Sequence, residues 1–171
     1  REYRMNFALH TYPKPMICWG HGIVMGGGLG VMAGCSHRIV TEKTRIAMPE
    51  VTIALFPDVG GSWFLNHMPG KAGLFLALTG ASINAADAIY TGIADRFIAS
   101  EHKQAVLDGL LSQSFGADAA ANHGLVKHAL RPLAEKSIGA LPAGQVEPHM
   151  ATIAQLCDGD SIHDVIDNIL G

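Results

Sequence analysis

The chain has 171 residues, a formal net charge of −3 at pH 7 and an isoelectric point near 6.3, and 49% of its residues are hydrophobic. A weakly acidic chain whose lysines and arginines form no run is a poor partner for nucleic acid or an anionic membrane. No apolar stretch reaches the roughly 18 residues that span a bilayer, and the N-terminal REYRMNFALH is unlike a signal peptide. One domain with a sizeable buried core is therefore expected.

The first part of the chain predicts a helix, a buried strand and a second helix. Residues 2–11 are typical of a partly buried helix that ends before Pro13. Residues 16–25, MICWGHGIVM, are apolar and β-branched near their ends, as in a buried strand with a glycine break. Residues 26–35, GGGLGVMAGC, predict a helix of small residues whose glycines let the backbone approach another group closely.

Strands and helices are expected to alternate as far as residue 99, with helices to follow. The expected strands are 37–41, 44–50 and 93–99, and the expected helices are 60–67, 71–78, 84–92 (capped by Asn84) and 100–114. An Ala-rich tail interrupted by prolines then predicts three short helices, of which SIHDVIDNIL, capped by Ser161, is the clearest. This order indicates an α/β fold with a helical C-terminal part.

Two residue types often used for redox chemistry or metal binding show no such pattern. The three cysteines, Cys18, Cys35 and Cys157, lie beside apolar residues and form no Cys-x-x-Cys pair. We therefore expect buried free thiols in a reducing compartment. Among nine histidines, His123 and His128 have a loose metal spacing but no evident third ligand, so no metal site is predicted.

The glycine cluster has three interpretations. Residues 28–33, GLGVMA, match the dinucleotide-binding pattern, and Glu50 follows at about the distance of a ribose-binding acid. However, the strand that should carry this acid is 37–41, and the acid near its end, Glu42, comes too early. Tight packing of the helix against a strand, with no ligand role, is the second interpretation. In the third, glycines that open a helix offer N–H groups and the positive end of its dipole to an oxyanion, such as that of a thioester.

Two acids, Glu50 and Asp58, bracket the apolar stretch VTIALFP. Asp58 could simply cap a helix that begins near Gly60, and Glu50 could be an exposed loop acid. A loop this hydrophobic is expected to be buried, however, and its flanking carboxylates would then lie in a partly apolar cleft. Such a cleft suits acid–base or nucleophilic chemistry.

Residues 14–98 resemble the crotonase (enoyl-CoA hydratase/isomerase) superfamily. The resemblance rests on MGGGLG, AMPE, ALFPDVGG and GKAGLFLALTG, with a weaker match at residues 1–3. Within the superfamily, the 3-hydroxyisobutyryl-CoA hydrolases are the most similar branch. The resemblance implies a crotonase-like α/β fold, a superhelix of stacked ββα turns whose sheets are roughly perpendicular and surrounded by helices.

The resemblance also implies roles for individual residues. Hydratases of the superfamily carry a glutamate at the position of Gly30, which has no carboxylate here, and glycine at the position of Asp58. This exchange implies a hydrolase. Gly27 would donate its N–H to the thioester oxygen, and Glu50 would be the catalytic carboxylate, as nucleophile or as general base. Asp58 would orient Glu50 or the substrate hydroxyl, and Glu2 falls at a further substrate-contact position.

The implied reaction is hydrolysis of a short branched 3-hydroxyacyl-CoA, 3-hydroxyisobutyryl-CoA, to CoA and the free hydroxy acid, as in valine breakdown. Two alternatives stay open: a hydratase or isomerase that uses Glu50 alone, and a non-catalytic chain that keeps only packing or assembly surfaces. The expected partner is an acyl-CoA substrate, without nucleic acid or membrane, and homo-oligomers are common in the superfamily. No metal or redox cofactor is implied, since coenzyme A belongs to the substrate. The expected location is the cytoplasm, or the mitochondrial matrix in a eukaryote.

Residues 1–114 are expected to form the crotonase-like core, incomplete at its N-terminus, and residues 115–171 a helical C-terminal segment. The chain begins without Met and inside a predicted helix, so we expect a piece of a longer protein. The family's second oxyanion N–H would then lie before Arg1, and the loss of one such donor lowers a rate by roughly 10²–10³.

Overall fold

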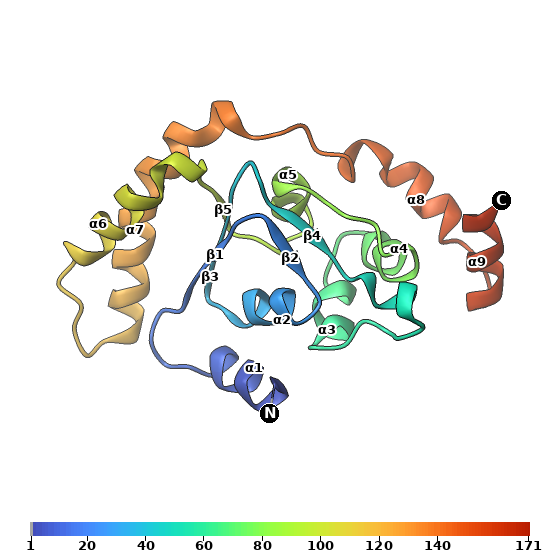
Figure 1. Ribbon diagram of the computed structural model, residues 1–171, viewed down its shortest axis with the longest axis horizontal. Coiled ribbons are helices and arrows are strands. Elements are labelled where there is room, and N and C mark those ends of the chain that lie inside the picture. Colours follow the sequence, from blue (N-terminus) through green and yellow to red (C-terminus); the bar gives the residue numbers. More distant parts are fainter. Residues whose placement is uncertain (1) are drawn as a thin grey trace.

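The computed structural model describes residues 2–171, with side chains from Tyr3 onward, and it alternates strands and helices before a helical second half (Figure 1). The strands are β1 (Ile17–Gly20), β2 (Ile23–Met25), β3 (His37–Val40), β4 (Arg45–Ala47) and β5 (Arg96–Phe97). The helices are α1 (Glu2–His10), α2 (Gly27–Gly34), α3 (Gly61–Asn66), α4 (Ala72–Thr79), α5 (Ala85–Tyr90), α6 (Lys103–Leu111), α7 (Ala119–Ser137), α8 (Met150–Leu156) and α9 (Ile162–Leu170). Short 3-10 helices are η1 (Pro49–Ile53), η2 (Ser100–His102), η3 (Ile138–Ala140) and η4 (Glu147–His149).

Two small parallel sheets form the centre of the fold. One has the strand order β1-β3-β5, and the other pairs β2 with β4. The strand predicted over residues 16–25 is two strands, because the chain turns at Gly22, whose φ of 70° suits glycine, and passes from one sheet to the other. Trp19 then lies opposite Ile39. Each of the first two passes of the chain adds one strand to each sheet, and β5 then extends the first sheet, in agreement with a stacked ββα arrangement.

Some elements differ in length from their predictions. β4 ends early because Pro49, which has no N–H for a sheet, opens η1 instead. β5 spans only two residues. α7 is not a short helix but runs for 19 residues and continues through Pro132. Its Val126 and Leu130 are fully buried, and this packing outweighs the hydrogen bond that proline removes.

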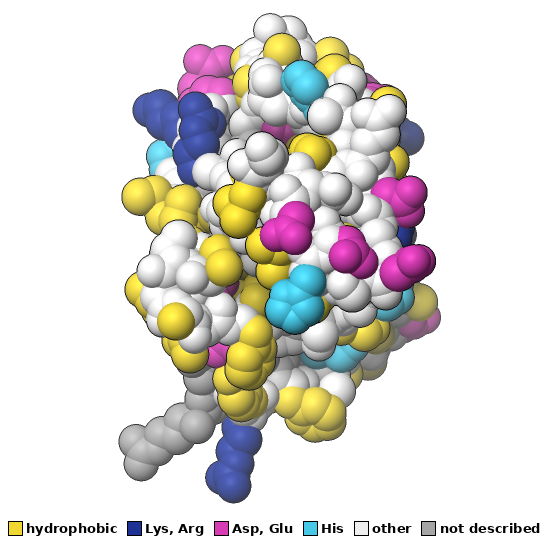
Figure 2. Space-filling model, turned by 90° about the vertical axis from the view of Figure 1, so that its right-hand side faces the viewer, with side chains coloured by type: hydrophobic (Ala, Val, Ile, Leu, Met, Phe, Trp, Pro, Cys, Tyr) yellow, Lys and Arg dark blue, Asp and Glu magenta, His cyan; other side chains and the backbone are white. Residues whose placement is uncertain are grey.

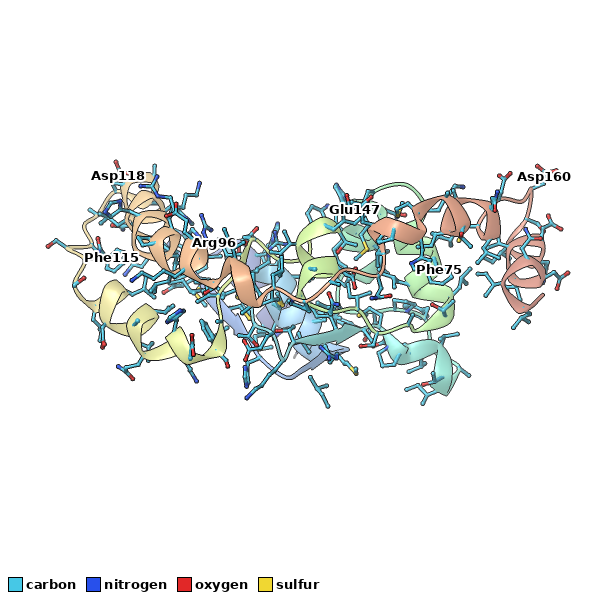
Figure 3. All side chains as sticks on the ribbon, turned by 90° about the horizontal axis from the view of Figure 1, so that it is seen from above. Phe75, Arg96, Phe115, Asp118, Glu147 and Asp160 are labelled. Atoms are coloured by element: carbon cyan, nitrogen blue, oxygen red, sulfur yellow. The ribbon has the colours of Figure 1, made fainter. Side chains whose placement is uncertain are left out.

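Two hydrophobic clusters join the helices to the sheets. The larger surrounds β2, β4 and the helices α2 to α5, and Ile153 of α8 and Val165 of α9 also belong to it. The smaller joins the first sheet to α6 and α7, and consists of Ile39, Ile98, Val106, Val126 and Leu130. Figure 3 shows the consequence, since α6 and α7 lie at one end of an elongated molecule and α8 and α9 at the other.

The three cysteines are free thiols, as expected from the sequence. Cys18, Cys35 and Cys157 are free, the first partly and the others fully buried. Figure 2 shows the side that carries α8 and α9, where hydrophobic side chains are interspersed with acidic and polar ones. Among the residues described here, no helix combines the length and apolar character that a membrane crossing needs.

The carboxylate of Asp87 fixes the C-terminal segment to α5. Asn84 caps α5, as predicted, and forms a capping box in which its backbone N–H donates to Asp87 Oδ2 at 3.2 Å. Oδ1 of Asp87 accepts the backbone N–H of Gln145 at 2.6 Å and that of Val146 at 2.8 Å. Asp87 is only 1% exposed. One dry carboxylate therefore ties the chain before α8 to the start of α5.

Asp87→Ala should lower the free energy of unfolding by about 3 kcal/mol or more, since each buried N–H left unpaired costs about 1–3 kcal/mol. Asp118→Ala, which removes the exposed N-cap of α7, should cost only about 1 kcal/mol. Urea unfolding followed by circular dichroism compares the two variants. Equal losses would contradict the anchoring role of Asp87.

A histidine pair, of which His37 is buried and His123 partly buried, joins β3 to α7. Nε2 of His37 lies 2.8 Å from Nδ1 of His123, and His37 is 2% exposed. Burial, followed by the charges of His123 and Arg96, lowers the pKa of His37 to about 4, although Asp95 acts in the opposite direction. The folded protein therefore keeps His37 neutral, and one ring of the pair donates its proton to the other.

Acid should destabilise the protein through this pair. Because the pKa of His37 lies below its ordinary value of 6.5, the unfolded state takes up a proton first as the pH falls. The stability contributed by neutral His37 is thus present above pH 6.5 and is lost progressively toward pH 4. His37→Gln should flatten the unfolding free energy in this pH range, measured by urea unfolding, whereas His163→Gln on the exposed face of α9 should not. An unchanged slope in His37→Gln would refute the assignment.

Candidate active site

The first turn of α2 presents backbone N–H groups that have no partner within the helix. Gly26, the N-cap, has φ 50° and ψ −123°, a conformation suited to glycine, and supplies no side-chain cap. The first turn also holds no acidic residue, so nothing in the helix itself neutralises the positive end of its dipole. Gly27, the predicted oxyanion donor, is the first residue of this turn.

Glu50 is buried against the start of α2. It follows Pro49, the first residue of η1, a position where the missing proline N–H costs nothing. Glu50 is only 8% exposed, and a Cβ placed on Gly26 would lie 3.0 Å from its Oε1. Oε2 is buried without a hydrogen-bond partner. A dry carboxylate with an unused oxygen beside free N–H groups has the properties of a reactive group.

The stretch between the two acids is exposed, so the expectation of a buried hydrophobic loop is wrong. Ile53 is 68% exposed and Phe56 is 75% exposed. The chain leaves η1 through Ala54, whose left-handed conformation (φ 58°) ends the 3-10 turn and directs the following residues outward. Glu50 is therefore buried beside Gly26 although the hydrophobic stretch that follows it is exposed.

The side chain of Asp58 is directed to α1. Tyr3 Oη donates a hydrogen bond to Asp58 Oδ2 at 2.9 Å. The interpretation of Asp58 as a helix cap is wrong, because the N-cap of α3 is Gly60 and no side chain bonds there. The backbone of Asp58 does shape the turn, since its carbonyl oxygen accepts the N–H of Gly61 at 2.6 Å.

The next residue, Val59, fills the space beside Gly30. Val59 has φ 45°, and this left-handed conformation costs a β-branched residue about 1–3 kcal/mol. Its side chain is nevertheless packed inward, with 6% exposure. A Cβ on Gly30 would lie 2.5 Å from Val59 Cβ and 3.0 Å from Asn6 Nδ2. In this arrangement no side chain fits at position 30. Val59 therefore occupies the space that a carboxylate at this position would need.

Helix α1 packs along the same glycine face of α2. A Cβ on Gly34 would lie 3.3 Å from Leu9 Cβ. Gly30 and Gly34 are therefore positions of tight packing, but their neighbours are the turn at Val59 and helix α1 and not the strand that the second interpretation expected. Asn6, between the two helices, has both amide atoms buried without partners. Figure 1 shows α1, α2 and α3 side by side below the sheets.

Two cavities meet at Val59. The first, of about 400 Å³, lies beside Asp58 and is also lined by Tyr3 and Phe56. The second, of about 290 Å³, lies between α1, α2 and α3, and its mostly apolar lining includes Phe7, Ala33, Gly30, Trp63 and Phe64. Val59 and its neighbour Gly60 line both cavities. The isopropyl group of Val59 is therefore part of the wall between them.

The predicted residues fall into two groups along the first turn of α2. Gly27 and Glu50 lie at its start, where Gly26 meets the Glu50 carboxylate. Asp58 lies with Tyr3, and the adjoining Val59 contacts the helix one turn later at Gly30. Glu2 begins α1 next to Tyr3, but its side chain lies outside the described residues.

The sequence analysis did not predict three residues of the candidate site: Tyr3 as the partner of Asp58, Asn6 with its buried amide, and Val59. The Tyr3–Asp58 bond joins residues 55 positions apart, which no local pattern reveals. The only local signal for Val59 is the Gly-Gly that follows it, a pair typical of a left-handed turn.

The residues considered in the sequence analysis for a metal site and for nucleotide binding have other partners in the structure. His123 pairs with His37 and not with His128, and within residues 3–171 no three potential ligands gather into a metal site. Glu42, considered for a nucleotide ribose, accepts the backbone N–H of Ser100 at 2.9 Å and also bonds the Ser100 hydroxyl. Its carboxylate therefore holds η2 in place.

A double-mutant cycle tests the contact between Gly30 and Val59. Gly30→Ala should lower the free energy of unfolding by about 1–3 kcal/mol, because the added methyl group overpacks the site. The loss should shrink in a Val59→Gly background, where only the contact with Asn6 Nδ2 remains close. Gly28→Ala, where the added methyl meets nothing within 4 Å, is the matched control on the same helix. Similar effects of Gly28→Ala and Gly30→Ala in urea unfolding would count against the contact.

The sequence matches the enoyl-CoA hydratase/isomerase family over residues 1–170. The human mitochondrial 3-hydroxyisobutyryl-CoA hydrolase is 34% identical over 168 residues, which are 98% of this chain and 42% of that protein. The small ribosomal subunit protein mS47 of Neurospora crassa is 44% identical over 99 residues, which are 58% of this chain and 20% of that protein.

A solved structure of a carnitinyl-CoA dehydratase from Mycobacterium thermoresistibile superposes with a TM-score of 0.82 at 37% identity, and the match covers 99% of this chain and 45% of that one. This likeness confirms the crotonase-like α/β fold. The chain spans less than half the length of each of these three proteins. Because the family match covers nearly all of its residues, the chain belongs to the enoyl-CoA hydratase/isomerase family of the crotonase superfamily.

Proposed function

We propose that this protein hydrolyses a short branched 3-hydroxyacyl-CoA thioester, 3-hydroxyisobutyryl-CoA, to CoA and the free hydroxy acid, a step of valine breakdown. The observation that carries the proposal is the buried, unpartnered Oε2 of Glu50 at the start of α2, together with the steric exclusion of a second carboxylate at Gly30. The human relative named as such a hydrolase supports the choice of substrate.

Gly27 would bind the thioester oxygen. Negative charge develops on this oxygen when the carbonyl carbon is attacked, and an N–H at the positive end of α2 would stabilise it. A single such donor lowers the activation free energy by about 2.7–4 kcal/mol in enzymes that use an oxyanion hole. Gly26 suits this geometry, because its φ of 50° favours glycine and a Cβ there would lie only 3.0 Å from Glu50 Oε1.

Glu50 would carry the chemical step in one of two ways. As a nucleophile, its oxygen attacks the carbonyl carbon and expels the CoA thiolate, and water then cleaves the resulting anhydride. As a general base, it takes a proton from the water that attacks the carbonyl directly. Both routes use a carboxylate oxygen with no internal partner, which supports a role for Oε2.

Asp58 would bind the hydroxyl group of the acyl chain. Because its Oδ2 accepts the phenol of Tyr3, the carboxylate is held in place and keeps Oδ1 for a substrate donor. Glu2 would contact the substrate from the same helix as Tyr3. This chemistry calls for no metal or redox cofactor, since hydrolysis transfers no electrons and the backbone N–H stabilises the oxyanion.

Two other functions have specific support. The solved relative named a dehydratase favours addition or removal of water at an enoyl or hydroxyacyl-CoA, with Glu50 acting alone. The relative named as a ribosomal subunit protein favours an assembly role, and the exposed Ile53 and Phe56 offer surface for it. The absent carboxylate at Gly30 disfavours the first, and the buried Glu50 disfavours the second, because an assembly surface has no need of a dry acid.

The proposed cellular location and partners are taken from the same relatives. The human hydrolase is named a mitochondrial protein, so we place this chain in the mitochondrial matrix if its source is a eukaryote and in the cytoplasm otherwise. An acyl-CoA is its proposed partner, and self-association is expected by analogy with the superfamily.

Glu50→Gln and Asp58→Asn should each lower the rate of thiol release from 3-hydroxyisobutyryl-CoA by about 10²-fold or more, because each removes a carboxylate from the reacting groups. Free CoA is measured with a thiol reagent, and loss of the enoyl absorbance of crotonyl-CoA is followed in parallel. Glu101→Gln and Asp160→Asn, two exposed acids, are matched controls and should retain the wild-type rate.

The possible results distinguish the hydrolase from the hydratase and from the assembly role. Thiol release from the hydroxyacyl thioester alone, abolished by the Glu50 and Asp58 variants, supports the hydrolase. Loss of enoyl absorbance without thiol release would replace it by a hydratase. Wild-type rates in both variants would remove Glu50 and Asp58 from the mechanism, and the absence of both reactions would favour the assembly role.

A further inference from the structure

We propose that Val59 sets the acyl-chain length that the protein accepts, by closing the passage from the cavity beside Asp58 into the apolar cavity between α1, α2 and α3. The inference rests on the proposed thioester hydrolysis and adds a specificity-determining residue to it. The second cavity would then take straight-chain acyl groups only when Val59 is reduced in size.

The wall position of Val59 carries this inference. Val59 and Gly60 line both cavities, and Gly60 has no side chain, so among the described residues the isopropyl group of Val59 is the one side chain that the two linings share. On its other side the group rests against Gly30, where a Cβ would come within 2.5 Å. The barrier is therefore wedged between the turn that carries Asp58 and the backbone of α2.

The backbone keeps this barrier in place. Val59 adopts a left-handed conformation (φ 45°) that disfavours valine, and Gly60 follows with φ 89°. An inward-facing β-branched residue in such a conformation persists only where its surroundings over-determine it. Because the same turn carries Asp58, the barrier stays beside the carboxylate proposed to bind the acyl hydroxyl.

The cavity behind the barrier suits a hydrocarbon chain. Its volume is about 290 Å³, and Phe7, Trp63 and Phe64 contribute to its apolar lining. Apolar cavities of about 150 Å³ bind benzene, so this one has room for several methylene groups. The chemical class expected to enter an opened site is a medium-chain 3-hydroxyacyl-CoA without branches.

Val59→Gly is the decisive variant. Glycine adopts positive φ readily, so the turn should keep its conformation while the wall is removed. Val59→Ala gives a partial opening, and it serves as the second test if the glycine variant folds poorly. Gly30→Ala in the Val59→Gly background should partly close the passage again, since its methyl group points into the vacated space. Val106→Ala, a buried valine of the smaller core cluster, is the matched control.

The experiment compares kcat/KM for thiol release from 3-hydroxyoctanoyl-CoA and from 3-hydroxyisobutyryl-CoA. The ratio of the two should rise about tenfold or more in Val59→Gly, less in Val59→Ala, and fall back in the double variant, because a few methylene groups suffice for such a factor. Val106→Ala should keep the wild-type ratio. A second readout is the fluorescence of Trp63, which should change on binding octanoyl-CoA in Val59→Gly but not in the wild type, with Trp19→Phe as background.

The outcomes separate this inference from the proposed function. If the wild type releases thiol from 3-hydroxyisobutyryl-CoA but neither Val59 variant changes the ratio or the Trp63 signal, Val59 is not the barrier and the hydrolase assignment stands. If the wild type releases no thiol from either thioester, the proposed function fails and the inference fails with it. A ratio raised equally by Val106→Ala would show general loosening of the core and would also overturn the inference.

Discussion

The absence of side chains along one face of α2 is the constraint on which the site depends. At Gly26 it admits the carboxylate of Glu50, at Gly30 it admits Val59, and at Gly34 it admits α1. Each neighbour comes from a different part of the chain, and the approach is closest at Gly30, where a Cβ would lie 2.5 Å from that of Val59. A helix of small residues thus acts as the common wall against which the acid-bearing turn and the first helix are positioned.

Unfavourable features are concentrated around the first turn of this helix. Glu50 and Asn6 keep buried polar atoms without partners, and such atoms cost about 1–3 kcal/mol each. Val59 adds a left-handed backbone. Native proteins contain few such groups, and a fold that served only packing would have replaced them by apolar ones. Their proximity is the structural feature that supports the proposed site in this part of the molecule.

The turn after η1 links the choice of acid to the shape of the site. In this turn the N–H of Gly61 donates to the carbonyl oxygen of Asp58, and two successive side chains point in different directions. Asp58 meets Tyr3 of α1, while Val59 meets Gly30 of α2. In this chain, therefore, the element that supplies an acid at one position also removes the space for an acid at another.

Much of this protein is determined locally by its sequence. The capping box of Asn84 and Asp87, the glycine that opens α2 and the proline that starts η1 act over a few residues, so they predict element types and the place of Glu50. The motifs MGGGLG and ALFPDVGG likewise indicate the family before any contact is known. Only the tertiary structure decided that the hydrophobic stretch after Glu50 is exposed, that Asp58 binds Tyr3, and that Val59 occupies the space at Gly30. These outcomes depend on which distant segments come together, and the burial of a residue is set by what the rest of the chain places beside it and not by its own hydrophobicity.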